Sequence, residues 1–413
     1  DQLKLGKQST SSLLFLQWFT TALGASELSF LTVTTSPEND QVLKIIEVFD
    51  SLDPLQKFAH IEQFSSAVEG AIARVPADLR SRFVRHAMRI IRNHPAGTGT
   101  KRLALLYDDL ESEVEFHCQI DGSSDVGTDP FGLHLSLRYT DALDRESKGF
   151  DIYLRNQVYI PLAQQPMDYK DDLEGRIREA FSEHFEIVAI QFNDPDFKPY
   201  SFNRPGWMEK SFAYIIMEAK DASVDLIPEV RIDLDFEDGT NGSVRIPVTS
   251  PVIPIVASTE SIPRPTHGTQ QVEMTLDDRE LEKGYLSLEI LADGLGVIPP
   301  LDVLVPGLNQ AFADSGFIPA EADALLDNGL NITEMHDDLL TSVATASPIV
   351  AKTERSWTLR FNQDNSTSTK ANFSFPPVSS GTQRVCKKYT DFDIVELDSS
   401  QVTLQVTKAS SWL

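Results

Sequence analysis

The sequence predicts a multidomain chain of α+β and mainly β class: a helical N-terminal domain, an α+β layer, and C-terminal immunoglobulin-like β-sandwich domains. The chain has 413 residues, which at roughly 150 residues per domain gives about three domains. Apolar residues recur at helical spacing between residues 39 and 93, and they alternate with polar residues, as in strands, beyond residue 206. No motif fixes a chemistry.

We place the domain boundaries where the period of the apolar pattern changes. Residues 1–102 form the helical domain and residues 103–205 the α+β domain. Residues 206–268 are a small β-sandwich or the first part of a larger one. Residues 269–413 are a β-sandwich with a helical insertion at about 301–345.

The charge balance excludes some classes of protein. The chain has 36 basic and 62 acidic residues and a net charge of −26, so nucleic acid and anionic membranes should repel it. No apolar run in the sequence reaches the 18 or so residues that a membrane span needs. We therefore expect a soluble chain with no nucleic-acid partner and no membrane span.

The segment Leu13–Leu31 has the composition of a secretory signal, since it follows two lysines, is rich in leucine and phenylalanine, and reaches small residues from Ala22 onward. Polar residues and Glu27 interrupt it, and a buried helix or strand pair is the alternative. The compartment stays open, with an extracytoplasmic location slightly favoured. Four glycosylation sequons do not decide it, because a chain rich in Ser and Thr has several by chance: Asn241, Asn331, Asn365 and Asn372.

Three amphipathic helices are predicted in the N-terminal domain. Pro54 fits the first residue of the second helix, and the third follows Pro76 and ends at residues 93–97. Their apolar faces comprise Val42, Ile45, Ile46 and Phe49; Phe58, Ile61, Phe64 and Val68; and Leu79, Phe83, Ala87 and Ile90.

Alternation predicts the elements of the α+β domain and of the sandwiches. In the α+β domain we expect a helix from about Tyr169 to Phe185 and strands at Leu103–Tyr107, Leu133–Tyr139, Ile152–Ile160 and Ile187–Phe192. In the last domain we expect helices at Asp302–Ala313 and Pro319–Asp327. The strands there are Val272–Leu276, Tyr285–Leu291, Trp357–Phe361, Asn372–Phe375, Phe392–Leu397 and Val402–Val406.

The strongest strand pattern is Glu229–Glu237, which a turn should join to Ser243–Val248 as a hairpin. Because side chains alternate between the two faces of a strand, we expect Val230, Ile232, Leu234 and Phe236 in the core and the acidic residues between them in water. The prolines at 247, 251, 254, 263 and 265 then indicate a linker or edge strands.

The basic residues of the third helix oppose the charge of the whole chain. At 100° per residue, one stripe gathers Arg82, Arg85, His86, Arg89 and Arg92. The stripe is a solvated face, a face docked on the chain's own acidic domains, or a contact for a partner protein with an acidic surface. Nucleic acid is disfavoured, because no aromatic residues are interleaved for stacking on bases.

Two short motifs suggest chemistry without supporting it. Gly97-Thr98-Gly99-Thr100-Lys101 is similar to a phosphate loop, but we expect it to leave a helix and enter a strand, the reverse of the order that phosphate binding requires. Asp314-Ser315-Gly316 and Asp327-Asn328-Gly329 resemble the triplets of aspartic proteases, but lie too close together to come from two symmetric halves. We interpret both as turns.

We expect no cofactor, apart from a weak calcium site. The candidate ligands are Asp121, Asp125 and Asp129, whose spacing differs from that of an EF-hand. A second acidic group lies near the hairpin. The eight histidines form no zinc motif. Cys118 and Cys386 are most simply two buried free thiols, because a bridge would need distant domains to touch.

The function that these patterns favour is non-enzymatic binding or assembly, through protein–protein contacts of the β-sandwich domains and the basic helix. The partner would be a protein with an acidic surface, or a second copy in self-assembly. The alternative is a hydrolase with a carboxylate-based site in the α+β domain or at a domain junction, where pockets preferentially form.

Overall fold

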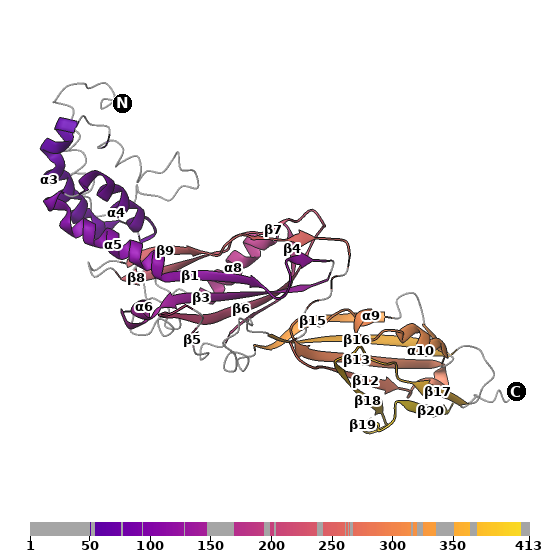
Figure 1. Cartoon of the computed structure of the whole chain (residues 1–413). Helices are drawn as coiled ribbons and strands as arrows, with labels where there is room; N and C mark the ends of the chain where they lie inside the picture. The colour runs from indigo at the N-terminus through magenta and orange to yellow at the C-terminus, as the bar shows by residue number, and fades with distance from the viewer. Residues whose placement is uncertain are drawn as a thin grey trace.

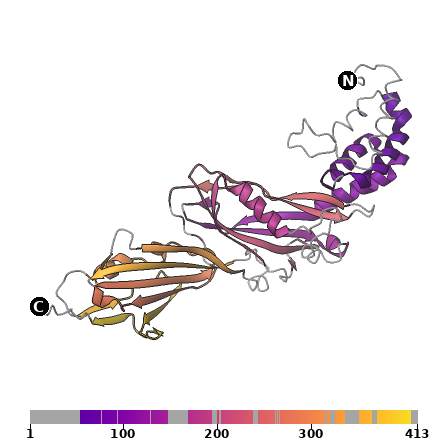
Figure 2. The same ribbon diagram turned by 180° about the vertical axis from the view of Figure 1, so that it is seen from behind.

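The structure is a computed structural model, and it mixes helices with antiparallel sheets (Figures 1 and 2). The predicted mixture of helices and antiparallel sheets is thereby confirmed, while the immunoglobulin-like plan and the four domains stay predictions. The three N-terminal helices lie at one end of an elongated molecule and the last strands at the other. The residues described are 50, 54–75, 77–92, 94–127, 129–146, 169–193, 199–201, 204–237, 243–260, 262, 264, 267–314, 317–319, 325–335, 351–363 and 370–405. The predicted first helix, the signal-like segment and the strand at 152–160 lie outside them.

Three helices form the N-terminal part: α3 (Pro54–Ala71), α4 (Ala77–Ile91) and α5 (Thr98–Glu113). The predictions for the second and third helices are confirmed. Arg80 of α4 is buried, and its Nη2 donates to the carbonyl oxygens of Ala73 and Val75 at 3.2 and 3.1 Å. This arginine therefore stabilises the end of the preceding turn.

The predicted strand at Leu103–Tyr107 is wrong, because these residues lie in α5. Five consecutive apolar residues do not distinguish a strand from a buried helix. The buried side chains Leu103, Tyr107 and Leu110 recur at the i, i+4, i+7 spacing of one helical face. α5 runs directly into β1 (Val114–Ile120).

An antiparallel sheet of order β1-β3-β6-β4 follows, with β5 (Tyr200–Ser201) paired to β6. The other strands are β3 (Phe131–Thr140), β6 (Trp207–Ala219) and β4 (Phe185–Phe192). Together with α6 (Asp141–Glu146) and α8 (Tyr169–Phe181), they confirm the predicted strands at 133–139 and 187–192 and the helix near 169–185.

The predicted hairpin is confirmed as β8 (Arg231–Glu237) and β9 (Ser243–Thr249), paired from Arg231↔Thr249 to Glu237↔Ser243. Its buried set is Val230, Ile232, Leu234 and Phe236, as predicted. Asp233 is a correction: it is only 5% exposed. Arg176 of α8 donates to its Oδ2 at 2.8 Å and Arg231 to its Oδ1 at 2.7 Å, so a buried ion pair holds this carboxylate.

The C-terminal part is a larger sheet of order β14-β16-β13-β12-β18-β19, in which β15 also pairs with β16. Its strands are β12 (Gln270–Asp277), β13 (Tyr285–Leu295), β14 (Phe317–Pro319), β15 (Leu325–Met335), β16 (Ala351–Gln363), β18 (Thr382–Tyr389) and β19 (Ile394–Glu396). A two-stranded sheet of β17 (Lys370–Ser374) and β20 (Gln401–Gln405) shares its core. Strands are present at all six predicted places, although β19 covers only residues 394–396 of the predicted Phe392–Leu397 and residue 406 lies outside the described residues.

The predicted helical insertion is half right. Residues 302–313 form α9 (Leu301–Leu304) and α10 (Leu308–Asp314), separated at Gly307, whose φ is +79°. The predicted helix Pro319–Asp327 is wrong, because its described ends lie in β14 and β15. Both ends pair with β16, so tertiary contacts select strands where the local sequence pattern predicted a helix.

The buried apolar side chains of the described residues form two cores. The first joins α3, α4 and α5 to the middle sheet, α8 and the β8–β9 hairpin, from Ile61 to Ile255. The second fills the C-terminal part and includes Tyr214 and Ile216 of β6. Cys118 and Cys386 are both buried and free, as expected. Among the described helices, none is both long and apolar enough to cross a membrane.

Candidate binding surfaces

The predicted basic stripe lies along α4 and continues to Arg92, the residue after it. Arg85 is half-buried: its Nε donates to Asp108 Oδ1 at 2.9 Å, and its Nη2 lies 2.7 Å from Glu111 Oε2. Burial alone would lower the pKa of Arg85, but Glu111 and Asp108 raise it. Both interactions of Arg85 are therefore with α5 of the same chain.

Arg82, Arg89 and Arg92 are exposed. Arg89 Nη1 lies 3.5 Å from His86 Nδ1, and Arg92 Nε donates to the Arg89 carbonyl at 3.3 Å. Within the described part of the chain, no carboxylate lies at ion-pair distance from Arg89 or Arg92. Arg89 and Arg92 thus keep their positive charge for solvent or for a partner.

α5 adds residues that the sequence interpretation did not assign to this surface. Lys101, Leu105 and Asp108 follow at i, i+4 and i+7, so they share a face of α5, and Asp108 pairs with Arg85 of α4. Leu105 is 54% exposed. We call the surface formed by Arg82, Arg85, Arg89 and Arg92 with Lys101 and Leu105 the basic face. Recognising residues 98–113 as a helix would have revealed its second half.

The interpretation of the segment Gly97–Lys101 also needs correction. The segment forms the first turn of α5, with Gly97 as the N-cap, instead of leaving a helix, so free backbone amides are present, as in an anion site. Those amides already have an anion: the backbone nitrogens of Gly99 and Thr100 donate to Glu69 Oε1 at 3.0 and 3.2 Å. A carboxylate from α3 therefore occupies the position that a phosphate would take.

The candidate calcium ligands are not brought together into a cage. Asp121 is buried, and its Oδ2 accepts from Tyr214 Oη at 2.7 Å while its Oδ1 lies 2.6 Å from His267 Nε2. Asp125 is exposed in the short strand β2 (Asp125–Val126) and Asp129 is half-exposed. No group of three or more His, Cys, Asp or Glu side chains among the described residues is arranged to hold a metal ion.

The linker into the C-terminal part lies against this same loop. β11 (Val256–Ala257) pairs in parallel with β2, and Arg264 Nη1 donates to the Ser123 carbonyl at 2.9 Å. A Cβ atom added to Gly127 would lie 2.1 Å from the Glu260 carbonyl oxygen, so only glycine fits. The acidic loop is thus a docking site for the linker.

The middle sheet also buries a polar row. His134 Nε2 lies 2.9 Å from Ser211 Oγ, Ser136 donates to Glu209, and Arg138 Nε lies 3.1 Å from Glu209 Oε2. Burial lowers the pKa of His134 to about 4. Burial likewise raises the pKa of Tyr214, with Asp121 adding to the shift. These groups satisfy one another, which is the usual state of buried polar groups.

An open groove of about 600 Å³ lies between the end of α5, β1 and residues 247–252. It is one place where the carboxylates of the alternative hydrolase could lie, and Glu111, Glu115 and Glu229 line it with His117. Two of these acids are already paired: Glu111 with Arg85, and Glu115 with Arg204 at 2.6 Å. Burial, and then the charge of Arg138, lowers the pKa of His117.

The protease-like triplets give no paired carboxylates. Asp314 Oδ1 accepts from Gln310 Nε2 at 2.6 Å at the end of α10. Asp327 lies in β15, and its Oδ2 is 2.6 Å from Arg355 Nη2. Each aspartate has its own structural partner.

The hairpin of β18 and β19 was missed as a site and carries an unusual exposed surface. Phe392 at its tip is 100% exposed, and Ile394 and Val395 of the edge strand β19 are also exposed. The sequence signal was the alternation of acidic and apolar residues from Asp391 to Asp398. We call residues 390–398 the acidic hairpin tip.

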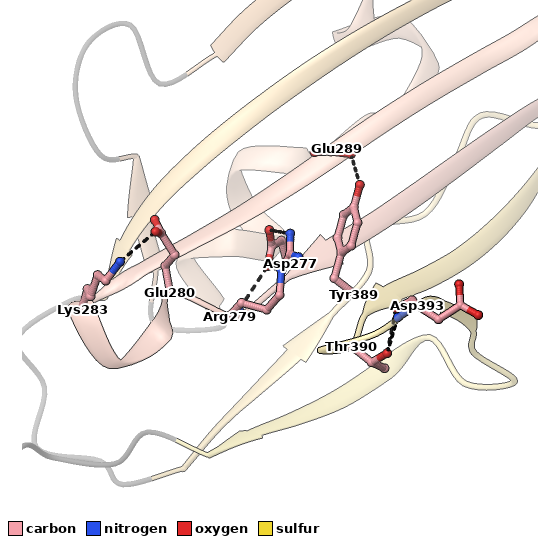
Figure 3. A network of polar contacts seen from close by, with 8 residues as sticks. All are labelled: Asp277, Arg279, Glu280, Lys283, Glu289, Tyr389, Thr390 and Asp393. Atoms are coloured by element: carbon pink, nitrogen blue, oxygen red, sulfur yellow. Dashed lines mark hydrogen bonds and ion pairs between the residues drawn. The ribbon is translucent and has the colours of Figure 1, made fainter.

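Polar contacts anchor this hairpin to the sheet (Figure 3). Tyr389 donates to Glu289 Oε2 at 2.9 Å, and the Arg279 guanidinium lies 4.5 Å from the centre of the Tyr389 ring while binding Asp277. The turn is closed by Asp393, whose nitrogen donates to Thr390 Oγ1 at 3.0 Å. These contacts join the turn to the sheet and close it with a side-chain hydrogen bond.

No protein-family model matches this chain, and no curated protein matches it. Among solved structures it is similar to the crystal structure of the collagen binding domain of Erysipelothrix rhusiopathiae surface protein RspB. The identity is 7% and the TM-score 0.13, over 72% of this chain and 94% of that chain. A TM-score this low carries no argument about fold or function.

Proposed function

We propose that this chain is a non-enzymatic binding or assembly protein that uses the basic face to bind a protein partner with an acidic surface. The observation that supports this function is the uncompensated charge of one part of this face, because Arg85 is already paired with Asp108 and Glu111. Arg89, Arg92 and Lys101 have no ion pair among the described residues, although the whole chain has a net charge of −26. Like charges one helical turn apart repel each other by a few tenths of a kcal/mol, so an opposing acidic surface would stabilise them.

Arg85 has a different role within this proposal. It is bound to Asp108 and Glu111, so it fixes α4 against α5 and positions its neighbours. A variant of Arg85 would therefore change stability as well as binding. The useful variants leave it in place and reverse the exposed arginines, Arg82, Arg89 and Arg92.

The experiment measures binding of a fluorescent poly-glutamate peptide of about 20 residues to the full chain, by anisotropy, at about 50 and about 300 mM NaCl. We expect binding at low salt, loss at high salt, and at least tenfold weaker binding by the triple variant Arg82→Glu, Arg89→Glu, Arg92→Glu. A variant with the same charge change elsewhere, Arg145→Glu, Arg178→Glu, Lys220→Glu, should bind as the wild type does.

Two results would overturn the proposal. One is equal binding of the peptide by the wild type and the triple variant. The other is tighter binding of a DNA duplex than of the peptide at about 150 mM NaCl, which would assign the face to nucleic acid.

A further inference from the structure

We infer that the partner is a second copy of this chain: the acidic hairpin tip of one copy docks on the basic face of the next. The inference rests on the proposed function and names its partner. It is carried by two surfaces of the same chain that complement each other in charge and in polarity.

The charges are opposite, and several on each side have no ion-pair partner among the described residues. Asp391, Asp393, Glu396 and Asp398 are exposed or half-exposed, and none of them forms an ion pair with another described residue. Asp393 Oδ1 accepts only a backbone bond, from Ile394 N at 2.8 Å. The carboxylates of the sheet nearby differ, because Glu273 and Asp278 bind Lys387 and Lys388. The hairpin tip thus presents acid where the basic face presents Arg89, Arg92 and Lys101.

Each surface also has an apolar centre within its charges. Phe392 stands fully exposed between Asp391 and Asp393, and Ile394 is 42% exposed. On the other side Leu105 is 54% exposed and follows Lys101 by one helical turn. An apolar anchor surrounded by charged residues is the arrangement of a protein–protein contact.

The hairpin tip is prepared for binding, because its conformation is already fixed. Thr390 N donates to the Asp393 carbonyl at 2.8 Å, and Tyr389 is held by Glu289 and Arg279. Docking such a tip requires little ordering of the backbone. β19 is moreover the last strand of its sheet, so nothing among the described strands pairs with its outer edge.

The two surfaces are different, so the contact is heterologous and joins copies head to tail. The helices that carry the basic face lie at one end of the molecule, and the C-terminal sheet with the hairpin belongs to the other (Figure 1). Copies joined end to end by this contact leave one surface free at each end of the assembly, so further copies add to it. We therefore expect a concentration-dependent series of oligomers.

The test is sedimentation velocity of the full chain from about 1 to about 100 µM, in low and high salt. The wild type should form oligomers that dissociate as salt rises. The basic-face variant Arg82→Glu, Arg89→Glu, Arg92→Glu and the tip variant Asp391→Lys, Asp393→Lys, Glu396→Lys should each remain monomeric. Mixing the two variants should restore oligomers, because each acidic surface then meets a basic one.

The apolar centre is tested separately. Phe392→Ala should weaken association by about tenfold or more, since a buried phenylalanine ring is lost from the contact. Ile318→Ala, which truncates a 49% exposed apolar side chain of β14 outside the proposed contact, should change nothing. The charge control is Glu179→Lys, Glu183→Lys, Glu186→Lys on exposed positions of the middle part.

Two outcomes overturn the inference: a wild type that is monomeric at every concentration, or oligomers that the tip variant still forms. Neither outcome changes the result of the poly-glutamate binding assay, which tests the proposed function independently. A monomer whose basic face still binds poly-glutamate would mean that the partner is a different acidic protein.

Discussion

His267 Nε2 lies 2.6 Å from Oδ1 of the buried Asp121, so a linker side chain binds a carboxylate at the end of β1. This hydrogen bond raises the pKa of His267. Tyr214 donates to the other oxygen of Asp121, and Arg264 binds the same loop. The pair therefore ties the linker, and with it the start of β12, to the middle sheet.

The stability of the chain should depend on the protonation of His267. The folded state holds the proton more tightly than the unfolded state does, so this contribution is complete below the unfolded pKa of about 6.5 and is lost as pH rises through the folded value. Urea unfolding at a series of pH values should show a decline above pH 6.5 in the wild type. The decline should be weaker in His267→Asn, whereas exposed His184→Asn should follow the wild type.

His134 should give the opposite slope on the acid side. Its folded pKa is about 4, because burial disfavours the charged ring. Between pH about 6.5 and about 4 the unfolded state binds a proton that the folded state does not. The free energy of unfolding should therefore decrease as the pH is lowered through this range, by up to about 3 kcal/mol. His134→Gln should flatten this part of the curve. An unchanged slope would contradict a neutral, buried His134.

Both Leu234 and Asp233 should matter to the β8–β9 hairpin. Leu234 is 0% exposed, and Leu234→Ala should reduce the free energy of unfolding by about 2 to 5 kcal/mol. Asp233→Ala removes the buried carboxylate that Arg176 and Arg231 bind and should cost about 1 to 3 kcal/mol. Glu229→Ala, at an exposed position before the strand, is the control. A silent Asp233→Ala would contradict the ion pair between α8 and β8.

Glu69 should stabilise α5 through its N-terminus. Its carboxylate accepts from the Gly99 and Thr100 amides, where a negative charge also interacts favourably with the helix dipole. Glu69→Ala should cost about 0.5 to 2 kcal/mol in thermal or urea unfolding. Glu62→Ala, exposed on the same helix, should have little effect. If inorganic phosphate restored the stability of Glu69→Ala, the vacated amides would have become an anion site.

Calcium should bind weakly at most to the loop from Asp121 to Asp129. Asp121 is occupied by Tyr214 and His267, and a calcium ion needs six or more oxygen ligands. Calorimetric titration of a chelator-treated sample should therefore show no sub-micromolar affinity. Tight binding that disappears in Asp125→Ala would overturn this prediction.

The sequence by itself determined the elements whose pattern is long and regular. The alternation from Val230 to Phe236 specified β8 and its buried side chains, since period two leaves each residue a choice of only two faces. The apolar spacing of Leu79, Phe83 and Ala87 and the charge along the opposite side specified α4 and its basic stripe in the same way.

Only the tertiary structure decided which of these groups meet. Arg176 of α8 binds Asp233 although the two residues are 57 positions apart in the chain. Glu69 binds the Gly99 amide at the start of α5, 30 positions away. The pair of His267 and Asp121 spans 146 residues. The apolar run at residues 103–107 fits a strand or a helix equally well, and packing of α5 against α3 and α4 selects the helix. Local patterns specify which face of an element is buried, whereas the partner of that face depends on contacts between distant parts of the chain.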